Sequence, residues 1–573
     1  MSRGLSATID AIKMKRCPTC RRDYFDDSLS FCLDDGDRLL EGPSPDEQQT
    51  EFLSGSAVFG DAETKQFDNR TTGENLPTLA ESTKRIRLLA VAGGALILVA
   101  LLAWGAYTLS GRGDSGQIAS IAVMPFVNAS GNPDIEYLSD GITESLINSL
   151  SQIPALSVKA RSSVFAYKGK DMMPQQVAKD LSVQAVLNGR VVQRGDQVVL
   201  NLELVDAATG NQLWGDQYSR KMTDLVQLQN EIARDVSGKL RSKLAGAGPA
   251  PKNYTENTEA YQLYLRGRYH WNKRTPDDVK KSIEYFQQAI DKDPTYALAY
   301  AAMAEAYILI PSYGTAPHQA ENYLKARAAA TKALEIDNSL AEAHNAIAAV
   351  LKGHDWRFAE AEAEWRKAIE LNPNYASAHQ WYAEYLLTMA RYPEALAEMR
   401  RAQELDPLSL IINGMVAMAL LSNGQDEAAL EQLRKTLEMD PNFPRTHLYF
   451  AAVYERMGRF DDAADQYAKL FVLAGGSPEQ AAKEAARVKN AARTGGSKAY
   501  SREMAQLLEG KAPSAVVAGL WGGAGEPDKA FAILEKAYRE HDDGLLMLKA
   551  PAVDPLKGDP RYKDLLRRVG LPE

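Results

Sequence analysis

Apolar residues between positions 255 and 475 recur with helical spacing, and the whole pattern repeats at a fixed interval. Pro373, Pro407 and Pro441 are 34 residues apart, and each follows a Leu or Met and then an Asn or Asp. Small and large side chains precede two of these prolines at matching offsets: Ala361, Trp365 and Ala368, then Ala395, Met399 and Ala402. A small residue lets two helices approach closely, and a large one fills the groove between them. The pattern therefore predicts an α-solenoid of about six stacked helical pairs.

This period and its closing phrase resemble those of tetratricopeptide repeats. Pro294 ends an earlier unit, and the 79 residues from Pro294 to Pro373 make two periods plus 11, which predicts an inserted loop around residues 310–318. Residues 476–573 are expected to form further helical pairs and a cap. His379 and His447 are two periods apart, so we interpret them as one repeat position and not as metal ligands.

The resemblance implies a binding surface for another protein. In tetratricopeptide arrays the first helix of each unit lines a concave face, which holds an extended segment or a helix of a partner. The repeat frame places seven residues on that face: Gln380, Glu384, Met418, Leu421, Arg445, Leu448 and Arg456. Apolar residues between charged ones suit a protein or peptide partner with an apolar middle and polar ends. Two alternatives stay open: these residues are merely solvated, or the chain's own tail from residue 476 covers them.

Residues 117–245 carry shorter apolar runs, which predict a small α/β domain. Strands are expected at 120–126, 156–160, 186–192, 198–205 and 212–218, with helices beginning near Asp140 and at Pro174 and a long helix at the end. The two middle strands form a hairpin that turns at Gly195-Asp196. Asp140 and Glu144 are interpreted as a helix cap and a first-turn acid, in preference to a catalytic pair.

Three phrases in this domain resemble a known bacterial module. They are Ile121-Ala-Val-Met-Pro-Phe, Leu138-Ser-Asp-Gly-Ile-Thr-Glu and Leu204-Val-Asp-Ala-Ala-Thr-Gly. The module is the TolB amino-terminal-like, or FlgO-like, domain that accompanies tetratricopeptide repeats in CadC-type regulators, membrane Ser/Thr kinases and cyclase-associated proteins. The resemblance implies a separate catalytic or DNA-binding head in such proteins, and residues 1–83 show no such head.

Residues 88–109, which precede the expected α/β domain, form an uncharged, apolar stretch. Its length predicts a single transmembrane helix within residues 84–110. Lys84, Arg85 and Arg87 precede it and Arg112 alone follows, so the positive-inside rule predicts a cytoplasmic amino terminus. The expected location is the bacterial inner membrane, with residues 112–573 extracytoplasmic.

The three cysteines of the chain all lie near its amino terminus. Cys17 and Cys20 form one C-x-x-C pair, and Cys32 and Asp35 repeat that interval. Zinc accepts three thiolates and a carboxylate, so the four residues predict a structural Zn²⁺ site. Residues 14–40 also resemble the short zinc-ribbon heads of bacterial membrane proteins. The alternative is a degenerate ribbon that binds the metal loosely or not at all.

The formal net charge of −9 argues against nucleic acid as the main partner, because such binders need a basic face. The sequence has no phosphate-binding loop, kinase catalytic phrase, nucleophile elbow or zinc-protease motif, so we expect no enzyme. It predicts a multidomain, mainly α protein: zinc-ribbon head (14–40), flexible linker (41–83), transmembrane helix (84–110), α/β domain (117–245), solenoid (255–475) and carboxy-terminal repeats with a cap (476–573). The expected function is a membrane-anchored interaction scaffold. The alternative is a transmembrane signalling receptor that acts through the zinc-ribbon head, and an enzyme in the α/β domain is the third candidate.

Overall fold

The computed structural model describes residues 15–16, 23–24, 40–41, 118–241, 252, 254–313 and 319–573. The chain divides into two units, residues 1–111 and residues 112–573. The described part of the first unit is a small antiparallel sheet of two-residue strands in the order β2-β1-β3. These strands are β1 (Lys15–Arg16), β2 (Asp23–Tyr24) and β3 (Leu40–Glu41).

The predicted location in a membrane needs correction. Among the described residues, no helix has both the length and the apolar character to cross a bilayer. The most apolar long helix, α8 (Ala297–Tyr313), has 17 residues, and the longest, α18 (Pro478–Leu508), carries charges along its length. The predicted span, residues 84–110, and residues 42–83 of the predicted linker lie outside the described residues. The structure therefore does not support a single-pass inner-membrane protein with extracytoplasmic domains, and we withdraw that prediction.

Strands of the second unit form one mixed sheet, in the order β6-β4-β7-β8-β9, and β5 also pairs with β7. The strands are β4 (Ser120–Val123), β5 (Val127–Asn128), β6 (Ser157–Val158), β7 (Ala185–Arg194), β8 (Gln197–Asp206) and β9 (Gln212–Lys221). β6, β4 and β7 run parallel, and β7, β8 and β9 run antiparallel. The predicted hairpin is present, and Gly195 at its turn has φ +61°, a conformation that glycine adopts readily.

Short and long helices complete the α/β domain. They are η2 (Pro133–Ile135), α2 (Glu136–Ser151), α3 (Arg161–Phe165), α4 (Pro174–Leu181), η3 (Met222–Asp224) and α5 (Leu225–Arg241). α2 begins at Glu136, and Asn132 caps the turn before it through a bond from the Asp134 amide. The prediction that Asp140 caps this helix is wrong, because Asp140 lies in its second turn with its side chain buried.

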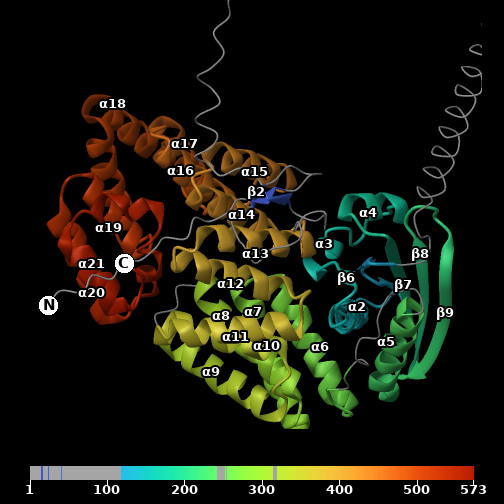
Figure 1. Ribbon diagram of the computed structural model, residues 1–573. Helices are drawn as coiled ribbons and strands as arrows, with labels where there is room; N and C mark the ends of the chain where they lie inside the picture. Colours follow the sequence, from blue (N-terminus) through green and yellow to red (C-terminus); the bar gives the residue numbers. More distant parts are fainter. Residues whose placement is uncertain are drawn as a thin grey trace, which may run out of the picture. The chain divides into compact units, whose positions relative to one another are not determined.

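Twelve helices between residues 258 and 473 form six antiparallel pairs (Figure 1). They are α6 (Thr258–Lys273), α7 (Pro276–Lys292), α8, α9 (Gln319–Ile336), α10 (Ala341–Val350), α11 (Phe358–Leu371), α12 (Ala376–Thr388), α13 (Tyr392–Leu405), α14 (Leu410–Ser422), α15 (Asp426–Met439), α16 (Pro444–Arg456) and α17 (Phe460–Leu473). Gly267 lies so close to the Phe286 ring that an added Cβ would be 2.4 Å from it. The small and large positions of the repeat thus pack against each other as the sequence predicted.

A π-helical turn, η4 (Leu351–Asp355), adds one residue to the third repeat unit. Side chains at one repeat position bond to carbonyl groups six residues earlier: His344 to Asn338, His379 to Pro373, Asn413 to Pro407 and His447 to Pro441. These carbonyl groups are 35, 34 and 34 residues apart, so the π turn accounts for one of the 11 extra residues. The other ten fall between Pro294 and Asn338, where the insertion was expected, and residues 314–318 of it lie outside the described residues.

Residues beyond the sixth pair continue as helices and return to the middle of the array. α18 folds at Gly496 into a hairpin, and α19 (Ser514–Gly523) pairs with α20 (Pro527–Glu540). The chain ends with η5 (Asp543–Met547), η6 (Pro551–Leu556) and α21 (Pro560–Val569). His541 stacks on Trp356 with ring centroids 3.8 Å apart, and the Tyr392 hydroxyl donates to the Lys549 carbonyl at 2.9 Å. The tail therefore packs against the turns that join the two helices of earlier pairs.

Candidate functional site

The predicted partner-binding residues lie on α12, α14 and α16, the first helices of three successive pairs. We call the surface that these helices form the first-helix face. Arg445 and Leu448 on α16 are exposed, and Leu448 keeps 39% of its surface open. Met418 on α14 is half-buried. Gln380 and Glu384 on α12 are also half-buried and bond to each other at 2.9 Å. This face is therefore most open at α16.

Two of the predicted residues contribute to packing instead. Leu421 is 1% exposed and belongs to the hydrophobic core between α12 and α16, so its assignment to an open groove was wrong. Arg456 donates to the Leu421 carbonyl at 2.7 Å and forms an ion pair with Asp426 at 3.1 Å. Its guanidinium group thus secures the turn between α14 and α15.

The structure adds two residues to this face that the sequence did not single out. Burial raises the pKa of the Tyr449 hydroxyl, which faces Arg445 and Glu384. Burial lowers the pKa of the Lys352 ammonium, although Glu384 and Asp543 both attract its charge. Lys352 lies in the π turn, whose extra residue moves it out of the regular 34-residue frame. Spacing alone could not have placed it near Glu384 of the first-helix face.

A buried ionic network joins the α/β domain to the solenoid. The Glu144 carboxylate on α2 accepts hydrogen bonds from Arg268 at 2.6 Å and Asn272 at 2.8 Å, and it pairs with Arg161 at 3.0 Å. Burial alone would raise the pKa of Glu144, but the Arg268 and Arg161 charges hold it below its usual value. Arg268 also reaches Glu305 on α8 at 3.2 Å. Glu144 thus lies in the third turn of α2, not in the first turn as predicted, and it serves the interface with the solenoid.

Asp140, one turn before Glu144, faces a different partner. Its carboxylate lies 2.5 Å from the Lys168 ammonium, which also pairs with Glu136 at 2.6 Å. Burial outweighs the attraction of Lys168 and raises the pKa of Asp140. This group is therefore part of the same structural network of charges along α2.

A second set of contacts connects the loop after β6 with the junction between α13 and α14. The Ala160 amide donates to the Leu405 carbonyl at 2.8 Å, and the Ser163 hydroxyl donates to Asp406 at 2.6 Å. Ser162 also donates to Asp406, whose pKa is raised by burial. These contacts join residues more than 240 positions apart in the chain. They indicate that the α/β domain and the solenoid form one structural unit.

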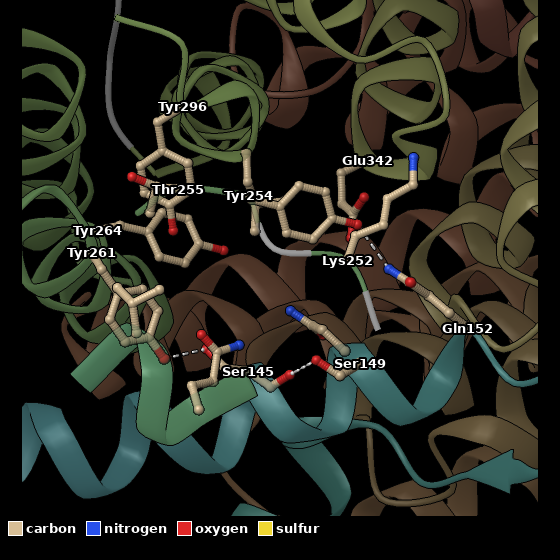
Figure 2. Close-up of a pocket in the computed structure, with 14 residues that line it drawn as sticks. Ser145, Ser149, Gln152, Lys252, Tyr254, Thr255, Tyr261, Tyr264, Tyr296 and Glu342 are labelled. Carbon is tan, nitrogen blue, oxygen red and sulfur yellow. Dashed lines mark hydrogen bonds between the residues drawn. The ribbon is translucent and has the colours of Figure 1, made fainter. Parts of the chain in front are cut away.

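Figure 2 shows a small pocket where α2 faces the first helical pairs and the segment before them. Tyr261 donates to the Ser145 hydroxyl at 3.1 Å, and Gln152 donates to the Tyr254 hydroxyl at 3.0 Å. Burial raises the pKa of Glu342 at its edge to about 7. The cavity holds about 30 Å³, which is room for roughly one or two water molecules. It is too small for a substrate and is better described as a small gap within the interface.

The histidines at the repeated position form hydrogen bonds within their own units. His379 bonds through Nδ1 to Glu398 at 2.6 Å and through Nε2 to the Pro373 carbonyl at 3.1 Å, and His344 and His447 make equivalent contacts. No cluster of three or more His, Cys, Asp or Glu side chains suited to a metal occurs in the part of the chain that the structure describes. Cys17, Cys20, Cys32 and Asp35 lie outside that part.

Sequence families match two regions of the chain. Residues 117–235 match the HilA/YgeH-like transcriptional regulator, second domain, and residues 364–397 match the tetratricopeptide repeat. The helical solenoid thus contains tetratricopeptide-repeat sequence. The α/β domain is similar to the HilA-like second domain, whereas the TolB amino-terminal-like assignment remains a resemblance.

Two curated proteins are similar in sequence to part of this chain. "Putative adenylate cyclase 3" of Rhizobium meliloti (strain 1021) is 34% identical over 243 residues, which is 40% of each chain. Transcriptional regulator HilA of Salmonella typhimurium is 24% identical over 233 residues, 38% of this chain and 39% of HilA. The chain thus spans about 40% of the length of these relatives.

Two solved structures are similar to part of this chain. Pseudomonas aeruginosa PilF covers 44% of this chain and 95% of its own, with 22% identity and a TM-score of 0.28. The pilus biogenesis factor PilW covers 38% of this chain and 96% of its own, with 19% identity and a TM-score of 0.31.

Proposed function

We propose that this protein is an interaction scaffold that binds a protein or peptide partner on the first-helix face of its solenoid. The observation that carries the proposal is the open end of this face at α16, where Leu448 lies 39% exposed beside the exposed Arg445. An apolar side chain beside a cation suits a partner segment with an apolar residue next to a carboxylate. The half-buried Met418 and Glu384 extend the same face toward α12.

The proposal predicts that acidic substitutions at Arg445 and Leu448 will reduce partner capture. The full chain carrying Arg445→Glu and Leu448→Glu should retain at least about tenfold less of a specific partner from extracts of its source cells, as for hot-spot residues. Quantitative mass spectrometry of the retained proteins measures the effect. The control is Arg434→Glu on α15, whose side chain is 54% exposed and lies outside this face. Equal retention by both variants would contradict the proposal.

A second candidate is a regulatory module in signalling. It is supported by the match of residues 117–235 to a transcriptional regulator's second domain and by the 34% identity to a protein named as a cyclase. In this candidate, occupancy of the solenoid changes what the amino-terminal segment contacts. A capture experiment on residues 14–40 distinguishes the two functions. In a regulator, the proteins retained by these residues should change when the solenoid partner is added.

The zinc site remains a prediction of this proposal. Three thiolates and the Asp35 carboxylate would complete a tetrahedral shell, and bound metal would stabilise a segment too short to build its own core. A peptide of residues 14–40 should bind close to one zinc per chain at neutral pH, measured by atomic absorption after dialysis. Replacement of Cys32 by Ser should lower the zinc content. A content below about 0.3 per unaltered chain would contradict the site.

A further inference from the structure

One side of the solenoid carries a regular series of acidic or amide side chains. They occupy the residue just before the repeat-closing position in five successive units: Asp293, Asp337, Asn372, Asp406 and Asp440. We call this series the junction ladder, because each member lies where one helical pair joins the next.

The first four members of the junction ladder are all bonded to residues that precede the solenoid. Thr255 donates to Asp293 at 2.5 Å, and Lys252 donates to Asp337 at 3.2 Å. Asn372 donates to the Ser151 hydroxyl at 3.0 Å, and Ser162 and Ser163 both donate to Asp406. The α/β domain and the segment after it therefore cover this side of the first units.

The fifth member, Asp440, differs from the first four in its hydrogen-bond partners. Its carboxylate accepts from the Asn442 amide at 2.8 Å, and among the described residues no side chain beyond this loop is bonded to it. A bond of this kind leaves room for another donor, because Asp293 accepts from the Thr295 amide at 2.9 Å while also binding Thr255. Asp440 therefore offers the same acceptor as Asp406 at the next junction.

The fourth junction, at Asp406, is more deeply buried than the fifth, at Asp440. Leu405, next to Asp406, is fully buried, whereas Met439 at the equivalent position is 42% exposed. Asp406 itself is 5% exposed, and Asp440 is only half-buried. The fifth junction thus shows to solvent a surface that the α/β domain covers at the fourth.

A groove of about 940 Å³ opens beside this junction. It runs between α17 and α18 and includes Leu437, Pro441 and Val472, and α18 contributes small alanine side chains that would allow a helix to approach closely. Val472 in this groove is 37% exposed. Exposed apolar surface of this kind, beside the carboxylate of Asp440, is typical of a protein-binding site.

We propose that the fifth junction and its groove bind a helix of another protein that begins with two consecutive serine or threonine residues. The helix α3 of this chain is the template for such a partner: Ser162 and Ser163 in its first turn bind Asp406, and Val164 behind them is fully buried. At the fifth junction the partner's hydroxyl groups donate to Asp440, and its apolar side packs on Val472 and the α18 alanines. The inference rests on the proposed scaffold function and names a second surface for it.

The test uses the full chain and a labelled peptide of residues 157–170, which contains the α3 sequence. We expect saturable binding by fluorescence anisotropy. Asp440→Asn should weaken it by about tenfold, because it replaces a hydrogen bond to a charged group with one to a neutral amide. Val472→Glu should weaken it by a similar factor, because it places a charge in the apolar contact. A peptide with both serines replaced by alanine should show a similar loss. The control Glu438→Gln removes a neighbouring exposed carboxylate and should leave the affinity unchanged.

Two outcomes of the peptide measurement would overturn the inference. Absence of binding, or equal binding by Asp440→Asn and the control, removes the fifth junction as a site. The variant Arg445→Glu with Leu448→Glu should bind the peptide normally, which separates this surface from the first-helix face. Normal peptide binding with no partner capture would count against the proposed scaffold function alone, and capture without peptide binding against the junction alone.

Discussion

Replacement of Glu144 by alanine is expected to lower the free energy of unfolding of the full chain by about 3–5 kcal/mol, the cost of leaving buried charges unpaired. The Glu144 side chain is 7% exposed, and it lies between Arg161 and Arg268, whose side chains are 19% and 14% exposed. Without the carboxylate, the two guanidinium groups repel each other in a largely buried position, and Glu305 is left as the acidic partner of Arg268. The loss should therefore far exceed that of a surface ion pair.

Urea unfolding followed by circular dichroism measures this effect, and Glu144→Gln separates charge from volume. The glutamine keeps the shape of the side chain and removes the charge, so it should also be strongly destabilising. The control is Glu431→Ala, because Glu431 is 54% exposed where it meets Arg434, and such pairs contribute about 0–1 kcal/mol. If Glu144→Ala loses no more stability than this control, the network does not hold the α/β domain to the solenoid.

Local elements were predictable because their signals lie within a few residues. The hairpin of β7 and β8 follows from alternating apolar positions and a Gly-Asp turn, and both were read from the sequence. The start of α2 at Glu136 was missed, because the helix was expected to begin near Asp140. The capping signal Asn132-Pro133 was present, but it belongs to the short helix η2 that precedes α2.

The binding face was less predictable because a repeat frame gives the side of a helix and not its neighbours. Leu421 falls on the predicted side, but the packing of α12 to α16 buries it. The π turn likewise has no local signal, and only the total of 11 extra residues showed that something had been inserted. Neighbouring helices therefore decided which residues remained open.

The interface between the domains could not be predicted from one sequence. Glu144 and Arg268 are 124 residues apart, and Ser163 and Asp406 are 243 apart. An acid in a helix is usually a solvated or first-turn residue, so its burial depends on a second domain whose position the pattern does not report. The same contacts made the junction ladder visible, because its members share a repeat position but obtain their partners from elsewhere.

Replacement of Trp365 by alanine is expected to destabilise the middle of the solenoid by about 3–5 kcal/mol, the usual cost of removing a buried tryptophan. Trp365 is 1% exposed, and its ring lies 5.3 Å from that of Tyr385. Its indole N–H donates to Asn345 at 3.0 Å, so the variant also removes the donor to a buried amide oxygen. Trp365→Phe keeps most of the ring and should cost less.

The equivalent position in the next repeat unit provides a comparison for the Trp365 variant. Met399 occupies the equivalent position of the next unit and is fully buried, so Met399→Ala should cost about 2–5 kcal/mol. Arg366, adjacent to Trp365 and 61% exposed, should tolerate alanine with a loss below about 1 kcal/mol. Urea unfolding gives the totals, and hydrogen exchange should show the loss of protection first in α10, α11 and α12, because each unit is stabilised mainly by its neighbours. Equal exchange in these helices and in α16 would show that the large position does not stabilise its own unit.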